Sequence, residues 1–303
     1  MGILIDKNTR VVIQGITGKE GSKATREMLD YGTVISCGVT PGKSGSTVEG
    51  LPVFDGVKEA IEYDPRINTS VIYVPPLMVF DAAVEAIRNG IKTVLIFTEN
   101  VPSKDSAKLV DYASRNNARV IGPSSIGLIN VGVGKLGSIG GSKEQDMYSK
   151  GKIGIISKSG GMCAETALLL TKEGLGQSTV IGIGGDLIIG STFTDLLELF
   201  GKDSETDAVV IYGEIGTSYE LNVAEFLKKN KDFKKPIIAF IAGQFAQSID
   251  RQVSFGHAGA IIENGHETAE AKKNALREAG AYVANYHDEI PSLVKQALNK
   301  SGK

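Results

Sequence analysis

The stretch Val11-Val-Ile-Gln-Gly-Ile-Thr-Gly-Lys-Glu-Gly21 decides the fold. Its first part, Val11–Ile16, is a short apolar run rich in β-branched residues, which is typical of a buried strand. Three glycines then fall within seven residues, and the following segment, Lys19–Tyr31, is helix-like. A strand that turns through glycines into a helix is the opening unit of a parallel α/β sheet.

The same alternation continues through the first half of the chain. We expect strands over Val11–Ile16, Thr33–Val39, Ser70–Val74, Thr93–Thr98 and Arg119–Gly122, and helices over Lys19–Tyr31, Val79–Asn89 and Ser103–Asn116. Strands that alternate with helices predict a parallel sheet with helices on both faces.

Residues 131–151 interrupt this alternation, because they are rich in glycine, serine and charge with little periodicity. The pattern then resumes. Strands are expected over Lys152–Ser157, Ser178–Gly184, Asp207–Glu214, Pro236–Ala242 and Ala281–Ala284, and helices near Gly161–Glu173, Thr192–Phe200, Tyr219–Lys229, Glu267–Ala279 and Ile290–Leu298. We therefore predict an α/β protein with one domain over residues 1–130, a connecting segment over 131–151 and a second domain over 152–303.

The composition of the 303 residues narrows the class of protein. Hydrophobic residues make up 42% and charged residues 22%, as in a globular enzyme. The net charge is −2, and no basic run suggests nucleic acid or a membrane surface as a partner. The first ten residues do not resemble a signal peptide, and no stretch approaches the ~18 apolar residues that span a bilayer. Two cysteines cannot build a disulfide framework, so we expect a cytoplasmic protein.

Two loops at the carboxyl ends of expected strands are candidates for holding phosphate. In Gly15–Gly21, backbone amides at the start of a helix suit a phosphate, although a tight strand-to-helix turn explains the same glycines. Lys43, framed by Gly42 and Gly45, is either a phosphate contact or a solvated loop lysine. No acidic residue ends the second strand as a ribose ligand, which argues against NAD.

The loop Lys158–Met162 opens the second domain in a similar way. Small residues and amides at a helix N-terminus favour an anion site, and the alternative is ordinary N-capping by Ser159. The segment is not G-x-S-x-G, so a serine nucleophile is disfavoured. Cys163 stands in the first turn, where a thiol pKa can be lowered, but packing explains this residue better.

His257 lies in the run Gly256-His-Ala-Gly-Ala260, on a long connection over Gly243–Gly259. Its small neighbours leave the ring accessible, and a neutral imidazole can accept and return a phosphoryl group. Glu214 closes an apolar strand between glycines, and it either orients this histidine by accepting its other N–H or is a buried structural acid.

The other histidines, His266 and His287, lie in polar sequence and are expected at the surface. No second histidine or cysteine stands at metal-ligand spacing from His257, so we do not expect a metal there.

Several motifs occur together in an order and spacing that are specific to one family. They are Thr17-Gly-x-x-Gly, Gly38-Val-Thr-Pro-Gly-Lys, Gly182-Ile-Gly-Gly-Asp, Gly213-Glu-Ile-Gly and Gly256-His-Ala-Gly-Ala. Over nearly the whole chain they resemble the α subunit of succinyl-CoA synthetase and its relatives. The resemblance implies a Rossmann-like CoA-binding domain followed by a flavodoxin-like ligase domain, and an ADP-forming acid–CoA ligase.

The resemblance also implies a mechanism. ATP with Mg²⁺, bound mainly by a larger ATP-grasp β subunit in an αβ or α2β2 assembly, would phosphorylate His257 with support from Glu214. The phosphoryl group would pass to a small carboxylic acid, and the CoA thiolate would attack the acyl phosphate. The implied phosphate-binding residues are Ser159, Gly160, Gly161 and Met162. The implied coenzyme A-binding residues are Thr17, Gly18, Lys19, Glu20, Gly21, Val39, Pro41, Lys43, Tyr73, Val74, Pro75, Thr98, Glu99, Ser124 and Ser125.

Two segments depart from the succinyl-CoA synthetase pattern. Gly122-Pro-Ser-Ser-Ile-Gly127 stands where that family usually reads Gly-Pro-Asn-Cys-Pro-Gly, and Gly184-Gly-Asp-Leu-Ile-Ile-Gly190 replaces Gly-Gly-Asp-Pro-x-Pro-Gly. Segments that are instead similar to half of ATP-citrate lyase are Gly137–Gly141, Ser159–Met162, Phe255–Gly259 and Glu267–Gly280. We therefore expect citrate as the acid, as in the small subunit of citryl-CoA synthetase, with succinate as the alternative.

Two other functions stay open at this point. CoA-binding domains of this fold also occur in regulatory proteins, although these usually lack a second domain and the Gly-His-Ala-Gly loop. A Rossmann dehydrogenase would bind NAD, whereas our interpretation predicts binding of CoA and none of NAD.

Overall fold

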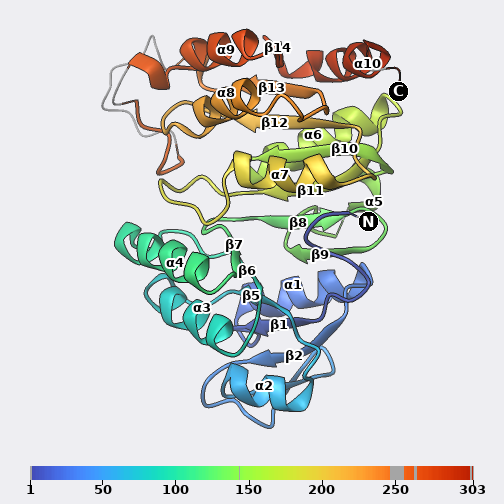
Figure 1. Cartoon of the computed structure of the whole chain (residues 1–303). Helices are drawn as coiled ribbons and strands as arrows, with labels where there is room; N and C mark the ends of the chain where they lie inside the picture. Colours follow the sequence, from blue (N-terminus) through green and yellow to red (C-terminus); the bar gives the residue numbers. More distant parts are fainter. Residues whose placement is uncertain (1, 143, 246–255, 263–264, 301, 303) are drawn as a thin grey trace. The chain divides into compact units, whose positions relative to one another are not determined.

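The computed structural model describes the chain apart from residues 1, 143, 246–255, 263–264, 301 and 303. The chain forms two compact units (Figure 1). The N-terminal unit consists of Leu4–Ser142 with Ile188–Ser191, and the C-terminal unit consists of Met1–Ile3, Lys143–Leu187 and Thr192–Lys303. The chain contains two mainly parallel sheets, so the predicted α/β class is confirmed.

The sheet of the N-terminal unit runs in the order β3-β4-β2-β1-β5-β6-β7. Its strands are β1 (Val11–Gln14), β2 (Ile35–Val39), β3 (Thr47–Val48), β4 (Leu51–Phe54), β5 (Thr69–Ile72), β6 (Thr93–Ile96) and β7 (Arg119–Ile121). Neighbours are parallel except β3 and β4, which are antiparallel. The order β4-β2-β1-β5-β6-β7 is the 3-2-1-4-5-6 arrangement of Rossmann folds, in which ligands bind where the order reverses, at the carboxyl ends of the strands.

Helices cover this sheet because their apolar residues recur on one face. In α3 (Val79–Arg88), for example, Val79, Ala83, Ala86 and Ile87 are all buried in the core. The remaining elements of the unit are α1 (Lys19–Asp30), α2 (Val57–Tyr63), the 3-10 helix η1 (Pro76–Met78), α4 (Ser103–Arg115) and an antiparallel hairpin of β8 (Gly127–Asn130) and β9 (Gly134–Gly137).

In the C-terminal unit, parallel strands lie in the order β14-β13-β12-β10-β11. They are β10 (Lys150–Ser157), β11 (Gln177–Gly182), β12 (Ala208–Gly213), β13 (Ile237–Ile241) and β14 (Tyr282–Ala284). The helices are α5 (Glu144–Met147), α6 (Gly160–Lys172), α7 (Phe193–Lys202), α8 (Tyr219–Lys229), η3 (Gly265–Glu267), α9 (Ala269–Glu278), η4 (His287–Glu289) and α10 (Ile290–Lys300). Counted along the chain, this is the 2-1-3-4-5 order of flavodoxin-like folds, as predicted.

The structure differs from the expected elements in a few places. The segment 131–151, expected to be irregular, contains β9 and α5, and the stretch between β2 and β5 contains β3, β4 and α2, which we did not predict. Of the long connection over Gly243–Gly259, residues 246–255 lie outside the described part of the chain, and these include Phe255 of the lyase-like segment Phe255–Gly259. Within the described ranges, no helix is both long and apolar enough to cross a membrane.

Candidate functional site

His257 and Glu214 meet at the carboxyl edge of the C-terminal sheet. Nδ1 of His257 lies 2.6 Å from Oε2 of Glu214, within hydrogen-bond distance. Glu214 follows directly on β12, and its side chain is only 11% exposed, whereas that of His257 is 33% exposed. The two residues are 43 positions apart in the sequence and are brought together by the order of the strands.

The charge of Glu214 fixes the role of each ring nitrogen of His257. Burial acts to raise the pKa of Glu214, but the hydrogen bond with His257 and the positive charge of Lys158 outweigh it and hold the pKa below its ordinary value. An ionised carboxylate can only accept, so Nδ1 of His257 carries the proton that it donates to Glu214. Nε2 then keeps its lone pair, which gives this ring nitrogen the electronic character of a nucleophile.

Lys158, which we did not single out from the sequence, contributes a buried positive charge. It follows β10, its side chain is fully buried, and its Nζ lies 3.0 Å from Oε1 of Glu214. Nζ also donates to Oγ1 of Thr217 at 3.3 Å and lies 5.5 Å from the centre of the Tyr219 ring. In the sequence, the indication of a role for Lys158 is its position between an apolar strand and a run of small residues.

Glycines let the loops at this edge approach one another closely. A Cβ on Gly185 would lie 2.4 Å from Cγ of His257, so the imidazole packs directly on the Gly185 backbone. The amide of Gly259 donates to the carbonyl of Gly185 at 2.9 Å, and a Cβ on Gly216 would lie 2.2 Å from the carbonyl oxygen of Gly259. Larger residues at these positions would push the His257 segment away from Glu214.

The amino end of α6 carries the predicted phosphate-binding residues Ser159, Gly160, Gly161 and Met162. Ser159 is the N-cap residue, yet its side chain makes no capping hydrogen bond, so the capping alternative is wrong. Gly161 is exposed, with no heavy atom within 4 Å of the position of a Cβ. Lys158, the residue before Ser159, forms an ion pair with Glu214, so this helix end is connected to the site.

Cys163 and His287 do not belong to the chemistry of this site. Cys163 is buried, and burial raises the pKa of its thiol to about 12, which fits packing rather than reactivity. The prediction that His287 is a surface residue is wrong, since it is half-buried, with Nε2 2.9 Å from Oγ1 of Thr166 and burial lowering its pKa. His266 is exposed, as expected. No three His, Cys, Asp or Glu side chains in the described ranges are grouped to hold a metal.

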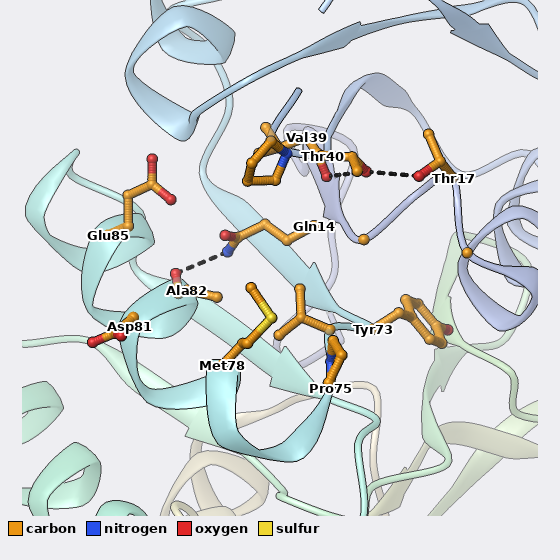
Figure 2. Close-up of a pocket in the computed structure, with 14 residues that line it drawn as sticks. Gln14, Thr17, Val39, Thr40, Tyr73, Pro75, Met78, Asp81, Ala82 and Glu85 are labelled. Atoms are coloured by element: carbon orange, nitrogen blue, oxygen red, sulfur yellow. Dashed lines mark hydrogen bonds between the residues drawn. The ribbon is translucent and has the colours of Figure 1, made fainter. Parts of the chain in front are cut away.

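The N-terminal unit contains a separate cavity of about 650 Å³, a size typical of small-molecule sites (Figure 2). It lies at the carboxyl ends of β1, β2 and β5, where the strand order reverses. The residues that line it are Gln14, Gly15, Thr17, Gly18, Val39, Thr40, Pro41, Tyr73, Val74, Pro75, Met78, Asp81, Ala82 and Glu85. The sequence pattern placed a ligand at this edge of the sheet.

Hydrogen bonds within this cavity fix its polar side chains. Gln14 donates from Nε2 to the carbonyl of Ala82 at 3.0 Å and to Oγ of Ser70 at 3.0 Å. Figure 2 shows Gln14 crossing the cavity to Ala82, and Thr17 joined to Thr40, whose hydroxyls lie 3.2 Å apart. A few fixed polar groups among apolar walls suit a ligand with both apolar and polar parts.

The cavity includes only part of the predicted coenzyme A set. It is lined by Thr17, Gly18, Val39, Pro41, Tyr73, Val74 and Pro75 but not by Lys19, Glu20, Gly21, Lys43, Thr98, Glu99, Ser124 or Ser125. The glycine at position 21 is explained by close packing instead, because a Cβ there would lie 2.3 Å from the carbonyl oxygen of Gly15. The hydroxyl of Thr98 donates to the carbonyl of Val74 at 2.7 Å, so Thr98 supports the cavity wall from behind. Lys43 lies in an exposed turn, where its backbone amide donates to the carboxylate of Asp55.

The sequence missed lining residues from the helix beside the cavity, namely Met78, Asp81, Ala82 and Glu85. These residues follow β5 in η1 and α3, and no glycine or lysine marks them as ligand contacts. Gln14, within the expected strand Val11–Ile16, was also not among the predicted binding residues.

Comparison with known proteins identifies the family. Residues 6–100 match the CoA binding domain family, and residues 156–282 match the CoA-ligase family. The Succinate--CoA ligase [ADP-forming] subunit alpha of Aquifex aeolicus is 47% identical over 300 residues, which is 98% of this chain and 95% of that protein. The chain belongs to the succinate–CoA ligase alpha-subunit family. The resemblance inferred from the motifs, and with it an acid–CoA ligase, is therefore confirmed at the level of the family.

Other members and a solved structure support the same assignment. The Succinate--CoA ligase [ADP-forming] subunit alpha 2 of Archaeoglobus fulgidus is 45% identical, covering 98% of this chain and 100% of that protein. The structure of Methanosaeta concilii ATP citrate lyase, a D541A mutant in complex with (3S)-citryl-CoA, superposes with a TM-score of 0.91 at 28% identity. It covers 98% of this chain, which spans about half (51%) of the lyase chain.

Proposed function

We propose that this chain is the catalytic α-type subunit of an ADP-forming succinate–CoA ligase, and that His257 carries the phosphoryl group. The observation that carries the proposal is the 2.6 Å contact between His257 and the ionised Glu214, on the glycine-lined edge of a CoA-ligase domain. We now place succinate before citrate, because relatives with 42–47% identity over nearly the full chain are named succinate–CoA ligases. The initial preference for citrate is thus less well supported than its alternative.

The first step is phosphorylation of Nε2 of His257. Its lone pair forms a bond to the γ-phosphorus of ATP while the bond to the bridging oxygen breaks, and ADP leaves with the electron pair. The imidazole ring becomes cationic as the N–P bond forms. Glu214 stabilises this charge through its hydrogen bond from Nδ1, which is why an ionised carboxylate is needed there.

The second and third steps pass the group on. A carboxylate oxygen of the acid attacks the phosphorus, the N–P bond breaks and neutral His257 returns. The CoA thiolate then attacks the carbonyl carbon of the acyl phosphate and releases inorganic phosphate. In this scheme the amides of Gly160, Gly161 and Met162, the hydroxyl of Ser159 and the dipole of α6 hold the phosphoryl group. The amide of Ser159 is not among these donors, because it donates to Oγ of Ser157 at 3.1 Å. Lys158 keeps Glu214 ionised.

Coenzyme A is assigned to the cavity of the N-terminal unit. The match to the CoA binding domain family over residues 6–100 supports this assignment, as does the position of the cavity in a Rossmann-like sheet. We further propose that residues 1–130 form the CoA-binding domain, that 131–151 connect the domains and that 152–303 form the ligase domain.

The partner is the remaining part of the proposal. The name of an alpha subunit implies a β subunit, and we propose one of the ATP-grasp type that binds ATP with Mg²⁺, in an αβ or α2β2 assembly. When bound, the magnesium ion neutralises charge on the nucleotide phosphates. Both cysteines are buried free thiols, which is consistent with the reducing cytoplasm that we propose as the location.

Citrate is the second candidate acid, for a specific reason. The solved ATP citrate lyases, one with (3S)-citryl-CoA and one from Methanothrix soehngenii with citrate and coenzyme A, each superpose with a TM-score of 0.91. The segment Ser159-Gly-Gly-Met162, whose sequence is similar to a segment of ATP-citrate lyase, lies at the proposed phosphate site.

The experiment is an assay of CoA thioester formation by the chain co-expressed with its β subunit. Succinate, citrate and malate are compared at equal concentration with ATP, Mg²⁺ and CoA. We expect succinyl-CoA as the main product. Turnover of citrate without turnover of succinate would overturn the choice of acid, and no CoA thioester with any acid would overturn the proposed function.

A further inference from the structure

A buried ion pair lies directly behind Glu214. Lys272 in α9 and Glu220 in α8 have side chains that are 0% exposed, and Nζ of Lys272 lies 2.5 Å from Oε2 of Glu220. Neither residue contributes a contact to His257 in the proposed mechanism. Both residues, however, form hydrogen bonds with the backbone of Glu214, the residue that contacts His257.

The pair holds both backbone polar groups of Glu214. Nζ of Lys272 donates to the carbonyl oxygen of Glu214 at 2.7 Å and also to the carbonyl oxygen of Gly216. Oε1 of Glu220 accepts from the amide of Glu214 at 3.1 Å. Strand β12 ends one residue earlier, at Gly213, so these side chains take over where the hydrogen bonds of the sheet stop.

Such a pair is an expensive way to gain stability. Burial lowers the pKa of Lys272 despite the opposing charge of Glu220, which shows the cost of removing the ammonium group from water. Buried ion pairs often contribute no more to stability than apolar residues of similar volume. A role in setting geometry explains the arrangement better, since the peptide groups on both sides of the Glu214 Cα are fixed.

We propose that Lys272 and Glu220 are positioning residues for phosphoryl transfer, which hold the backbone of Glu214 so that its carboxylate meets Nδ1 of His257. This inference rests on the proposed role of His257. It assigns a function to two residues that were not among the predicted site residues. It predicts that a variant without the pair still folds but has an altered environment at His257.

The test removes both charges together. A single loss of charge leaves an unpaired buried ion, whereas the double variant Lys272→Met with Glu220→Met removes both charges and the side-chain hydrogen bonds to the backbone of Glu214 at similar volume. The matched control makes the same substitutions in a surface pair of the same unit, Lys295→Met with Glu173→Met, whose charged atoms lie 2.7 Å apart and whose side chains are about half exposed. Thermal unfolding midpoints establish that each variant folds.

Two measurements separate positioning from stability. With ¹⁵N-labelled histidine, NMR of the chain alone follows the Nδ1–H of His257, which is one of only three histidines. In the complex with the β subunit, the initial rate of acid-labile labelling from [γ-³²P]ATP is measured. We expect the double variant to fold, to shift or lose the Nδ1–H signal and to be labelled at least tenfold more slowly. The KM for ATP should be unchanged, and the control should match wild type in every measurement.

The outcomes distinguish this inference from the function on which it rests. A folded double variant with the wild-type Nδ1–H signal and labelling rate would overturn the inference alone. An unlabelled wild-type complex would overturn the proposed function, while the NMR comparison would still decide whether the pair positions Glu214. If this double variant does not fold, Lys272→Met with Glu220→Gln replaces it, because it also removes both charges but keeps an acceptor for the amide of Glu214. A slower labelling rate and a shifted Nδ1–H signal are expected for it, and wild-type values for both would count against the inference.

Discussion

Gly185→Ala should slow the phosphorylation of His257 by displacing its imidazole ring, although neither His257 nor Glu214 is substituted. The φ angle of Gly185 lies outside the left-handed region, so alanine is allowed by the backbone, but its Cβ would lie 2.4 Å from Cγ and 2.7 Å from Nδ1 of His257. Restoring ordinary van der Waals contact requires a displacement of the ring by about 1 Å. The 2.6 Å hydrogen bond to Glu214 would then stretch to about 3.6 Å and be lost.

The size of the effect follows from the bond that is lost. A hydrogen bond to a charged group contributes about 1.5–3 kcal/mol, and the partial exposure of His257 argues for the lower part of that range. Since each ~1.4 kcal/mol is a tenfold change in rate, the labelling rate of His257 should fall about tenfold to fiftyfold. The proposed ATP site on the partner is unchanged, so the KM for ATP should stay the same.

The assay is the initial rate of acid-labile labelling of the complex from [γ-³²P]ATP. Gly265→Ala is the matched control, because Gly265 lies in the same unit, has no heavy atom within 4 Å of a Cβ and has a φ angle outside the left-handed region. Its labelling rate should equal that of wild type. A wild-type rate in a folded Gly185→Ala variant would refute the claim that the packed geometry of His257 and Glu214 matters.

Three further results are expected. Lys158→Met removes the charge that lowers the pKa of Glu214, so that pKa should rise and the acid limb of the pH–rate profile for labelling should move to higher pH; an unmoved limb would contradict the role of Lys158. The thiols of Cys37 and Cys163, whose pKa values burial raises to about 12, should not react with a thiol reagent at pH 8 until the chain is unfolded, and rapid reaction of the native protein would show the burial to be wrong. Tyr73→Ala should weaken CoA binding about tenfold by calorimetry through loss of an aromatic wall, and an unchanged Kd would move CoA out of this cavity.

The sequence predicted those parts of the fold that depend on local patterns. Short β-branched runs such as Val11–Ile16 became the central strands, because such residues fit a doubly covered parallel sheet. The hairpin of β8 and β9 escaped prediction because its strands are rich in glycine and include Lys135. That lysine is fully buried, with its amine donating to the carbonyl oxygen of Gly141 at 2.6 Å, a contact that no local pattern reveals.

The candidate site shows the same division. His257 and Glu214 could be paired from the sequence because each is a reactive residue among glycines. Lys158 and Lys272 could not, since a lysine after a strand or in a polar helix is ordinarily solvated, and only the tertiary structure buries these two. The prediction that His287 is exposed was wrong for the same reason, because its half-buried position depends on Thr166 and other residues far away in the sequence.

The most direct test of the account is where the phosphoryl group is attached. The complex is incubated with [γ-³²P]ATP, and acid-labile label on this chain is compared among wild type, His257→Gln and His266→Gln, an exposed histidine of the same unit. The account predicts full labelling of wild type and His266→Gln, and none of His257→Gln. Undiminished labelling of folded His257→Gln would contradict it.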